Sequence, residues 1–138
     1  VTRRLALDVS RRLRCPVLSL LIHDDDIMYY ELWTNGSKRD TYDSAPGLLG
    51  DSNYSSKEPE PIGGDAYTLS DAFGVRANRI EIETVLRSTN FLFETDRHVA
   101  LGKLLGIPAY GIGIGYKYFK SGDYDSEISK EDYVATDS

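Results

Sequence analysis

Apolar residues recur with a helical period at the start of the chain. Further along, they form short runs of the length typical of strands. Leu5, Val9 and Leu13 stand four residues apart, so residues 2–14 are predicted to form a helix with one apolar stripe. Pro16 ends this helix, because proline lacks the amide hydrogen and restricts the residue before it.

A run of strand length follows the proline, and a second run leads into a tight turn. Residues 17–23 are largely apolar over a length typical of strands, so we expect a buried central strand there. Residues 27–34 are rich in the aromatic and β-branched side chains that strands favour. Asn35-Gly36 is a strong hairpin signal, because both residues of such a turn take positive φ, and residues 37–43 then return as a third antiparallel strand.

The two-residue turn also predicts which residues pair across the hairpin. Counting back from it places Glu31 directly opposite Asp40, and strand alternation divides the side chains between the two faces of the sheet. If residues 24–26 form a three-residue turn, the first strand adds its own alternate residues to the same two faces. The face that we predict to form the main core then carries Met28, Tyr30, Leu32, Leu18, Leu20 and Ile22.

The opposite face of the predicted sheet is the candidate partner-binding surface. Its members are Tyr29, Glu31, Trp33, Asp40 and Tyr42. Like charges placed opposite each other cost a sheet on the order of 0.2–1 kcal/mol, and Tyr and Trp contribute much of the energy at protein interfaces. An acidic pair framed by aromatic residues therefore fits a basic partner. The alternative is that helices cover this face and its aromatic residues belong to the core, in which case Trp33 is buried.

Helical patterns predominate after a long turn-rich connection at residues 44–64. Asp65 can cap a short helix, and residues 78–87 are predicted to form another with Ile82, Val85 and Leu86 inward, although part of this segment also fits a strand. A third helix is expected over residues 96–105. Its expected N-terminal cap is Thr95.

The last part of the chain is less regular. Residues 109–120 are assigned to a helix, although three glycines weaken it and a strand remains open. The tail at residues 121–138 is acidic and expected to be frayed. No internal repeat or linker divides residues 1–138. We therefore predict one α+β domain: an N-terminal helix, a three-stranded antiparallel meander, and a helical C-terminal half packed on the sheet.

Composition narrows the classes of partner. The chain has 138 residues and a net charge of -6, which disfavours binding to nucleic acid or to anionic membranes. No apolar run is long enough to span a membrane. Cys15 is the only cysteine, so it cannot form an internal disulfide and gives no sign of an oxidising compartment. We therefore expect a cytoplasmic protein.

Three successive aspartates are the weak candidates for metal binding. Asp24, Asp25 and Asp26 supply the oxygen ligands that Ca²⁺ and Mg²⁺ prefer, but their spacing is not that of an EF-hand. The favoured interpretation is a solvated acidic turn. The placement of His23 and His98 matches no zinc signature, and no nucleophile motif is present. We assign no catalytic residue, no metal and no cofactor.

A helix-turn-helix unit at residues 101–119 is the alternative to a protein-binding surface. The segment has apolar anchors and a glycine turn at Gly106, as such a unit needs. Its second helix offers only Lys117 and Lys120 as cations, whereas helices that read DNA bases use Arg, Asn or Gln.

Without a catalytic set, the leading hypothesis is a non-catalytic module that binds another protein, one of basic character. Bacterial toxin-immunity proteins are one class with the same small, acidic, motif-free sequences, although this is an analogy of class and not a motif match. A DNA-binding regulator is the second hypothesis, and an enzyme with an unrecognised site is the third.

Overall fold

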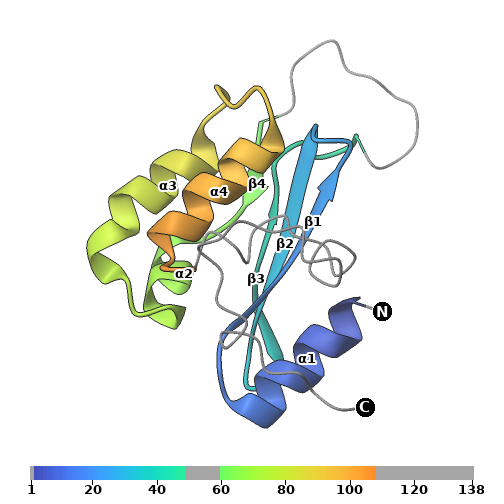
Figure 1. Ribbon diagram of the computed structural model, residues 1–138, viewed down its shortest axis with the longest axis vertical. Helices are drawn as coiled ribbons and strands as arrows, with labels where there is room; N and C mark the ends of the chain where they lie inside the picture. The colour runs from blue at the N-terminus through green and yellow to red at the C-terminus, as the bar shows by residue number, and fades with distance from the viewer. Residues whose placement is uncertain (1, 49–59, 108–138) are drawn as a thin grey trace, which may run out of the picture.

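A computed structural model describes residues 2–48 and 60–107 of the chain. It confirms the α+β class, with an N-terminal helix, an antiparallel sheet and helices in the C-terminal half packed on that sheet (Figure 1). Its four strands are hydrogen-bonded in the order β1-β2-β3-β4. In chain order the elements are α1 (Thr2–Leu13), β1 (Val17–His23), β2 (Ile27–Thr34), β3 (Ser37–Asp43), β4 (Ile62–Gly63), α2 (Ala66–Ala72), η1 (Arg76–Asn78), α3 (Arg79–Arg87) and α4 (Glu94–Leu104).

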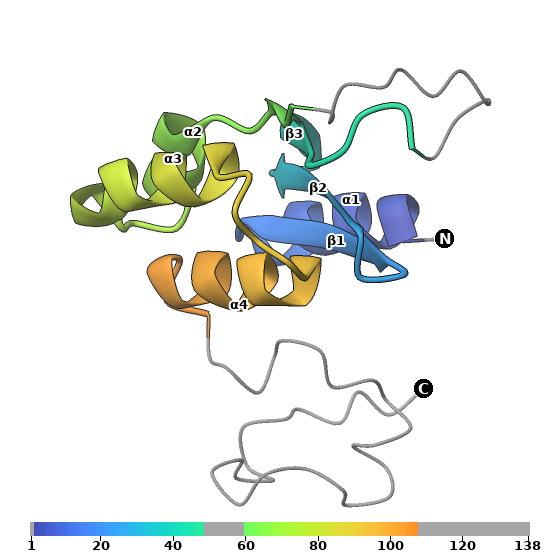
Figure 2. The ribbon, with the colours of Figure 1, turned by 90° about the horizontal axis from the view of Figure 1, so that it is seen from above.

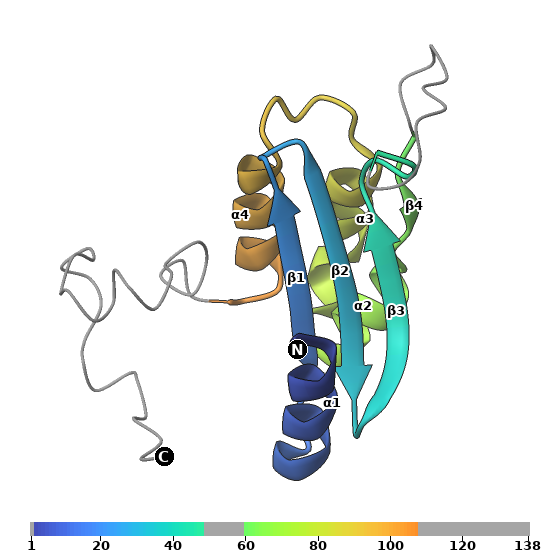
Figure 3. The same ribbon diagram turned by 90° about the vertical axis from the view of Figure 1, so that its right-hand side faces the viewer.

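Helices lie on both sides of the sheet. Figure 3 shows α1 in front of one end of β1 and β2, with α2 and α3 behind the strands and α4 beside β1 at the edge of the sheet. Seen from above, the strands again separate α1 from α2 and α3 (Figure 2). We call the side that carries α2–α4 the inner face and the side that carries α1 the outer face.

The inner face forms the apolar core, as predicted for this side of β1 and β2. Leu18 pairs with Leu32 and Ile22 with Met28, so the three-residue turn between these strands is confirmed. The rings of Tyr30 and Tyr42 stack with their centroids 5.3 Å apart. The other fully buried members of this core come from the helices and are Leu69, Ile82, Leu86 and Leu101.

The hairpin turn is confirmed, but the pairing beyond it differs from the prediction. Asn35 and Gly36 have φ values of 51° and 76°, as the predicted turn requires. A β-bulge then shifts the register, because Trp33 pairs with Lys38 whereas Leu32 pairs with Asp40. The extra residue moves every later side chain of β3 to the other face. Glu31 therefore pairs with Thr41 and does not lie opposite Asp40.

Two further elements differ from the sequence prediction. Part of the connection at residues 44–64 forms the short strand β4, which pairs with β3. Helix α4 begins at Glu94, with Phe93 at its N-cap position and no side-chain cap, so the assignment of Thr95 as the cap is wrong. Asp65 does cap α2, because its carboxylate accepts a hydrogen bond from the Tyr67 amide.

Helix α1 turns its apolar stripe away from the sheet. Ala6 and Ser10 are buried, whereas 60% of Leu5 and 69% of Leu13 are exposed. The apolar stripe of a surface helix ordinarily faces the core, so this orientation is unusual.

Several predictions fall on residues that are not described. The predicted helix at residues 109–120 and the acidic tail at residues 121–138 lie outside the described residues, as does most of the helix-turn-helix hypothesis at residues 101–119.

Candidate protein-binding surface

The five residues predicted to bind a partner do not share one exposed face. Tyr29, Glu31 and Trp33 lie on the outer face of β2, whereas the bulge places Asp40 and Tyr42 on the inner face. Only 7% of Trp33 is exposed, and Glu31 and Tyr42 are buried. The prediction of an exposed acidic and aromatic surface on this side of the sheet is therefore wrong.

Glu31 instead holds α1 on the outer face. Its carboxylate accepts hydrogen bonds from Arg3 at 3.0 Å and 2.6 Å, from the Tyr29 hydroxyl at 3.2 Å and from Lys38 at 3.4 Å. Burial alone raises the pKa of this carboxyl, but the hydrogen bonds and charges of Arg3 and Lys38 outweigh burial and lower the pKa below its usual value of 4.5. Glu31 is therefore ionised near neutral pH.

Asp40 and Tyr42 connect β3 to the helices behind the sheet. The Asp40 carboxylate accepts one hydrogen bond from the Tyr30 hydroxyl at 2.8 Å and another from the Asp65 amide at 2.9 Å. The Tyr42 hydroxyl donates to the backbone carbonyl of Leu86 at 2.8 Å. These contacts join the sheet to the start of α2 and to the end of α3, so both residues have structural roles.

The acidic turn between β1 and β2 contacts the beginning of α4. Asp25 accepts hydrogen bonds from the amides of Glu94 at 2.9 Å and Thr95 at 2.7 Å, through its backbone carbonyl and its carboxylate. An aspartate that is distant in sequence thus satisfies two amides that a free helix end leaves unpaired. Asp24 and Asp26 flank this contact with exposed side chains. Among the described residues, no group of three or more His, Cys, Asp and Glu side chains is placed to hold a metal ion.

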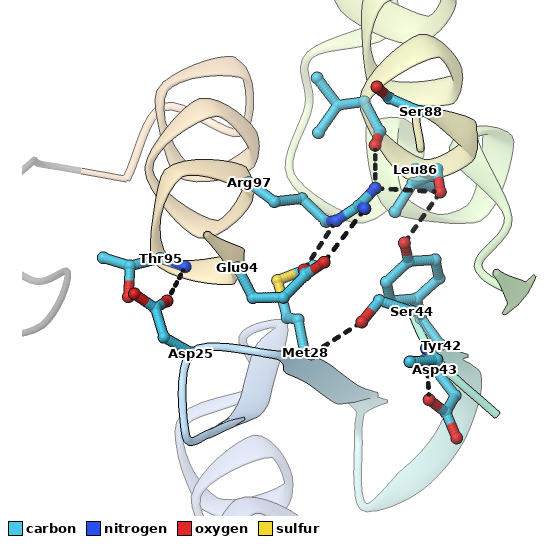
Figure 4. Close-up of polar contacts among 12 residues, drawn as sticks. Asp25, Met28, Tyr42, Asp43, Ser44, Leu86, Ser88, Glu94, Thr95 and Arg97 are labelled. Carbon is cyan, nitrogen blue, oxygen red and sulfur yellow. Dashed lines mark hydrogen bonds and ion pairs between the residues drawn. The ribbon is translucent and has the colours of Figure 1, made fainter. Parts of the chain in front are cut away.

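A buried ion pair ties the first turn of α4 to the last turn of α3. Arg97 donates to the Glu94 carboxylate at 2.7 Å and 3.1 Å, and it also donates to the Val85 carbonyl at 2.7 Å (Figure 4). Its guanidinium lies 4.8 Å from the centre of the Phe91 ring. A cation at this end of α3 also complements the helix dipole. The connection at residues 88–93 is therefore held where it leaves α3 and where it enters α4, with the Phe91 ring against Arg97 between them.

This fixed connection presents two large apolar side chains to solvent. Leu92 is 81% exposed and Phe93 is 50% exposed. Asp96, in the first turn of α4, is exposed beside them. We define the edge surface as Asp24, Asp26, Leu92, Phe93 and Asp96. This surface was not among the predicted sites, and its only signal in the sequence is the short apolar run Phe91-Leu92-Phe93 before a helix.

Comparisons with known proteins do not add an identity. No family model, no curated protein and no solved structure matches this chain. None of the helices that the structure describes is long and apolar enough to cross a membrane.

Proposed function

We propose that this chain is a non-catalytic protein-binding module and that its edge surface binds a partner carrying basic residues around an apolar recess. The observation that carries the proposal is the exposure of Leu92 and Phe93 on a connection that is anchored at both ends.

Anchoring matters because ordering a loop on binding costs free energy. The Arg97 contact with Val85 and the Asp25 contact with Thr95 already restrain the two ends of this connection in the free protein. A preorganised loop avoids that ordering cost, so its apolar side chains contribute more of their burial energy to binding. Exposed apolar patches mark surfaces that bind other proteins, and phenylalanine is among the residues enriched at such interfaces.

Charge favours a basic partner. Asp24 and Asp26 are exposed on either side of Asp25, which contacts the start of α4, and Asp96 is exposed in the first turn of that helix. The chain as a whole carries a net charge of -6. Complementary charge speeds association and discriminates against acidic partners more than it raises affinity. Toxin-immunity proteins remain one class that fits a small acidic module of this kind.

The test compares three chains as baits in extracts of the source cells. They are the unchanged chain, the Leu92→Ser/Phe93→Ser variant, and the control Ile80→Ser, which removes an apolar side chain that is 78% exposed on α3. We expect a basic protein that the unchanged chain and the control retain and the double variant loses, with all three baits melting at similar temperatures. Equal retention by all three baits would place the binding surface elsewhere.

A second pair of variants tests the acidic frame. Asp26→Asn with Asp96→Asn should slow association with that partner and reduce the salt dependence of the association rate. The dissociation rate should change less, because rim charges act mainly during encounter. An unchanged association rate at low salt would remove the acidic residues from the proposal.

A further inference from the structure

The outward stripe of α1 is a second apolar surface, distant from the edge surface, that no element among residues 2–48 and 60–107 covers. Leu5 and Leu13 are largely exposed and Val9 is half-buried, so one side of the helix presents apolar residues at four-residue spacing. In the views of Figures 1 and 3, α1 and the connection between α3 and α4 lie at opposite ends of the sheet.

Specific contacts hold α1 in this orientation. Arg3 reaches Glu31 from the first turn, and the Ser10 hydroxyl accepts the Gly36 amide at 2.9 Å near the other end. Arg11 lies over the turn that contains Gly36. If Gly36 carried a β carbon, that atom would stand only 2.8 Å from Nε of Arg11. Contacts in the first turn of the helix and near its other end therefore fix the outward direction of the stripe.

The positive charge around the stripe indicates which kind of segment can bind there. Arg4, Arg11, Arg12 and Arg14 are exposed, and residues 1–14 contain five arginines and a single acidic residue, Asp8. A second α1 packed on this stripe would bring arginines against arginines. The charge instead favours an acidic segment with apolar residues at helical spacing. An amphipathic helix with such a pattern can lay its apolar side against an apolar surface of another element.

The chain contains such a segment at residues 123–134. Its apolar residues are Tyr124, Ile128, Tyr133 and Val134, of which Tyr124 and Ile128 stand four positions apart and match the spacing of the stripe. Its acidic residues are Asp123, Asp125, Glu127, Glu131 and Asp132, with Lys130 as the single cation.

The connecting chain is long enough to reach α1. The 15 residues between position 107 and the segment can span up to about 50 Å when extended, whereas a small domain is roughly 30 Å across. Tethering gives a short linked segment an effective concentration of about 1 mM, so weak contacts suffice.

We propose that residues 123–134 bind the outward stripe of α1 within the same chain, with Tyr124 and Ile128 against the leucines and the acidic residues against the arginines. This inference does not depend on the edge surface.

The test is a charge-reversal cycle on the full chain, read by hydrogen exchange of the peptides that cover residues 2–14 and 121–138. Glu127→Lys/Glu131→Lys should speed exchange in both peptides by about fivefold, as expected for two exposed ion pairs. Arg4→Glu/Arg12→Glu should do the same, and combining the two pairs should restore slow exchange. Asp137→Lys, outside the segment, is the matched control and should change neither peptide.

Three further measurements control for unfolding of the variants, for the role of charge, and for binding between two copies of the chain. The peptide covering β2 reports whether any variant unfolds the sheet, and about 0.5 M salt on the unchanged chain should mimic the charge reversals by screening. Unchanged exchange in all variants, or no restoration in the combined chain, would overturn the proposal. Protection that falls on tenfold dilution would assign the segment to a second copy and overturn binding within one chain.

Discussion

The ion pairs on the two faces of the sheet differ in how much water reaches them. On the inner side, Glu94 and Arg97 are both buried, and Arg97 also satisfies the Val85 carbonyl. On the outer face Glu31 is buried, but the side chain of its partner Arg3 is 65% exposed. Breaking a buried pair leaves an uncompensated charge, whereas exposed partners can be replaced by water.

This difference separates the two candidate surfaces. The inner pair fixes the connection that carries Leu92 and Phe93, so the edge surface is ordered before any partner arrives. The outer pair holds α1 through Arg3, and water competes with Glu31 for the hydrogen bonds of this exposed guanidinium. We therefore expect α1 to leave the sheet at a lower free energy than α4 does.

Loss of the buried cation should have the largest effect. Arg97→Met leaves Glu94 buried and unpaired, and it should lower the free energy of unfolding by about 3–5 kcal/mol. Arg3→Met, the matched change on the outer face, should cost clearly less in the same urea titration. Equal losses would mean that burial does not distinguish the two pairs.

A substitution in the Asn35-Gly36 turn, which α1 contacts, should have the next largest effect on stability. Gly36→Val and Gly47→Val both place a β-branched residue at positive φ, which costs about 1–3 kcal/mol. Only at Gly36 would the new side chain also displace Arg11, because nothing lies within 4 Å of a β carbon at Gly47. Gly36→Val should therefore lower the melting temperature further. Equal shifts would show that the contact between α1 and the turn adds nothing to stability.

The inner face should respond to alkaline pH. Burial raises the pKa of Tyr42 from 10 to about 12, so its contribution is present below pH 10 and is lost as the pH rises toward 12. Tyr42→Phe should reduce the loss of stability in that range. At neutral pH it should cost about 1 kcal/mol for the hydrogen bond to Leu86. Identical alkaline profiles for the two chains would argue against a buried phenol.

The outer face should respond to acid, with the smallest effect. The pKa of Glu31 is lowered from 4.5 in the folded chain, so its contribution is present above pH 4.5 and is lost as the pH falls through the lower folded value. Glu31→Gln should flatten the stability curve in that acid range. Urea titrations between neutral pH and pH about 3 measure it, and a curve as steep as that of the unchanged chain would contradict the assignment.

Local patterns in the sequence predict the elements well but not all of their contacts. The Asn35-Gly36 turn and the alternation of β1 and β2 are local signals, and the structure confirms both. The bulge has no comparable signal in Lys38-Arg39-Asp40. The bulge instead matters for tertiary contacts, because it turns Asp40 toward the Tyr30 hydroxyl and the Asp65 amide.

The site could not be predicted for the same reason. Helical spacing groups Leu5, Val9 and Leu13 on one side of α1, but the contacts of Arg3 and Ser10 decide which side meets the sheet. The order of residues 88–93 likewise depends on contacts between segments far apart in the sequence.

The anchoring of residues 88–93 in the free protein can be measured directly by native-state hydrogen exchange. The amides of Glu94 and Thr95 donate to Asp25, so they should exchange nearly as slowly as the core amides of β2 and more slowly than those of α1. Arg97→Met should remove that protection. Exchange of the Glu94 and Thr95 amides at the rate of an unstructured peptide in the unchanged chain would contradict a preorganised edge surface.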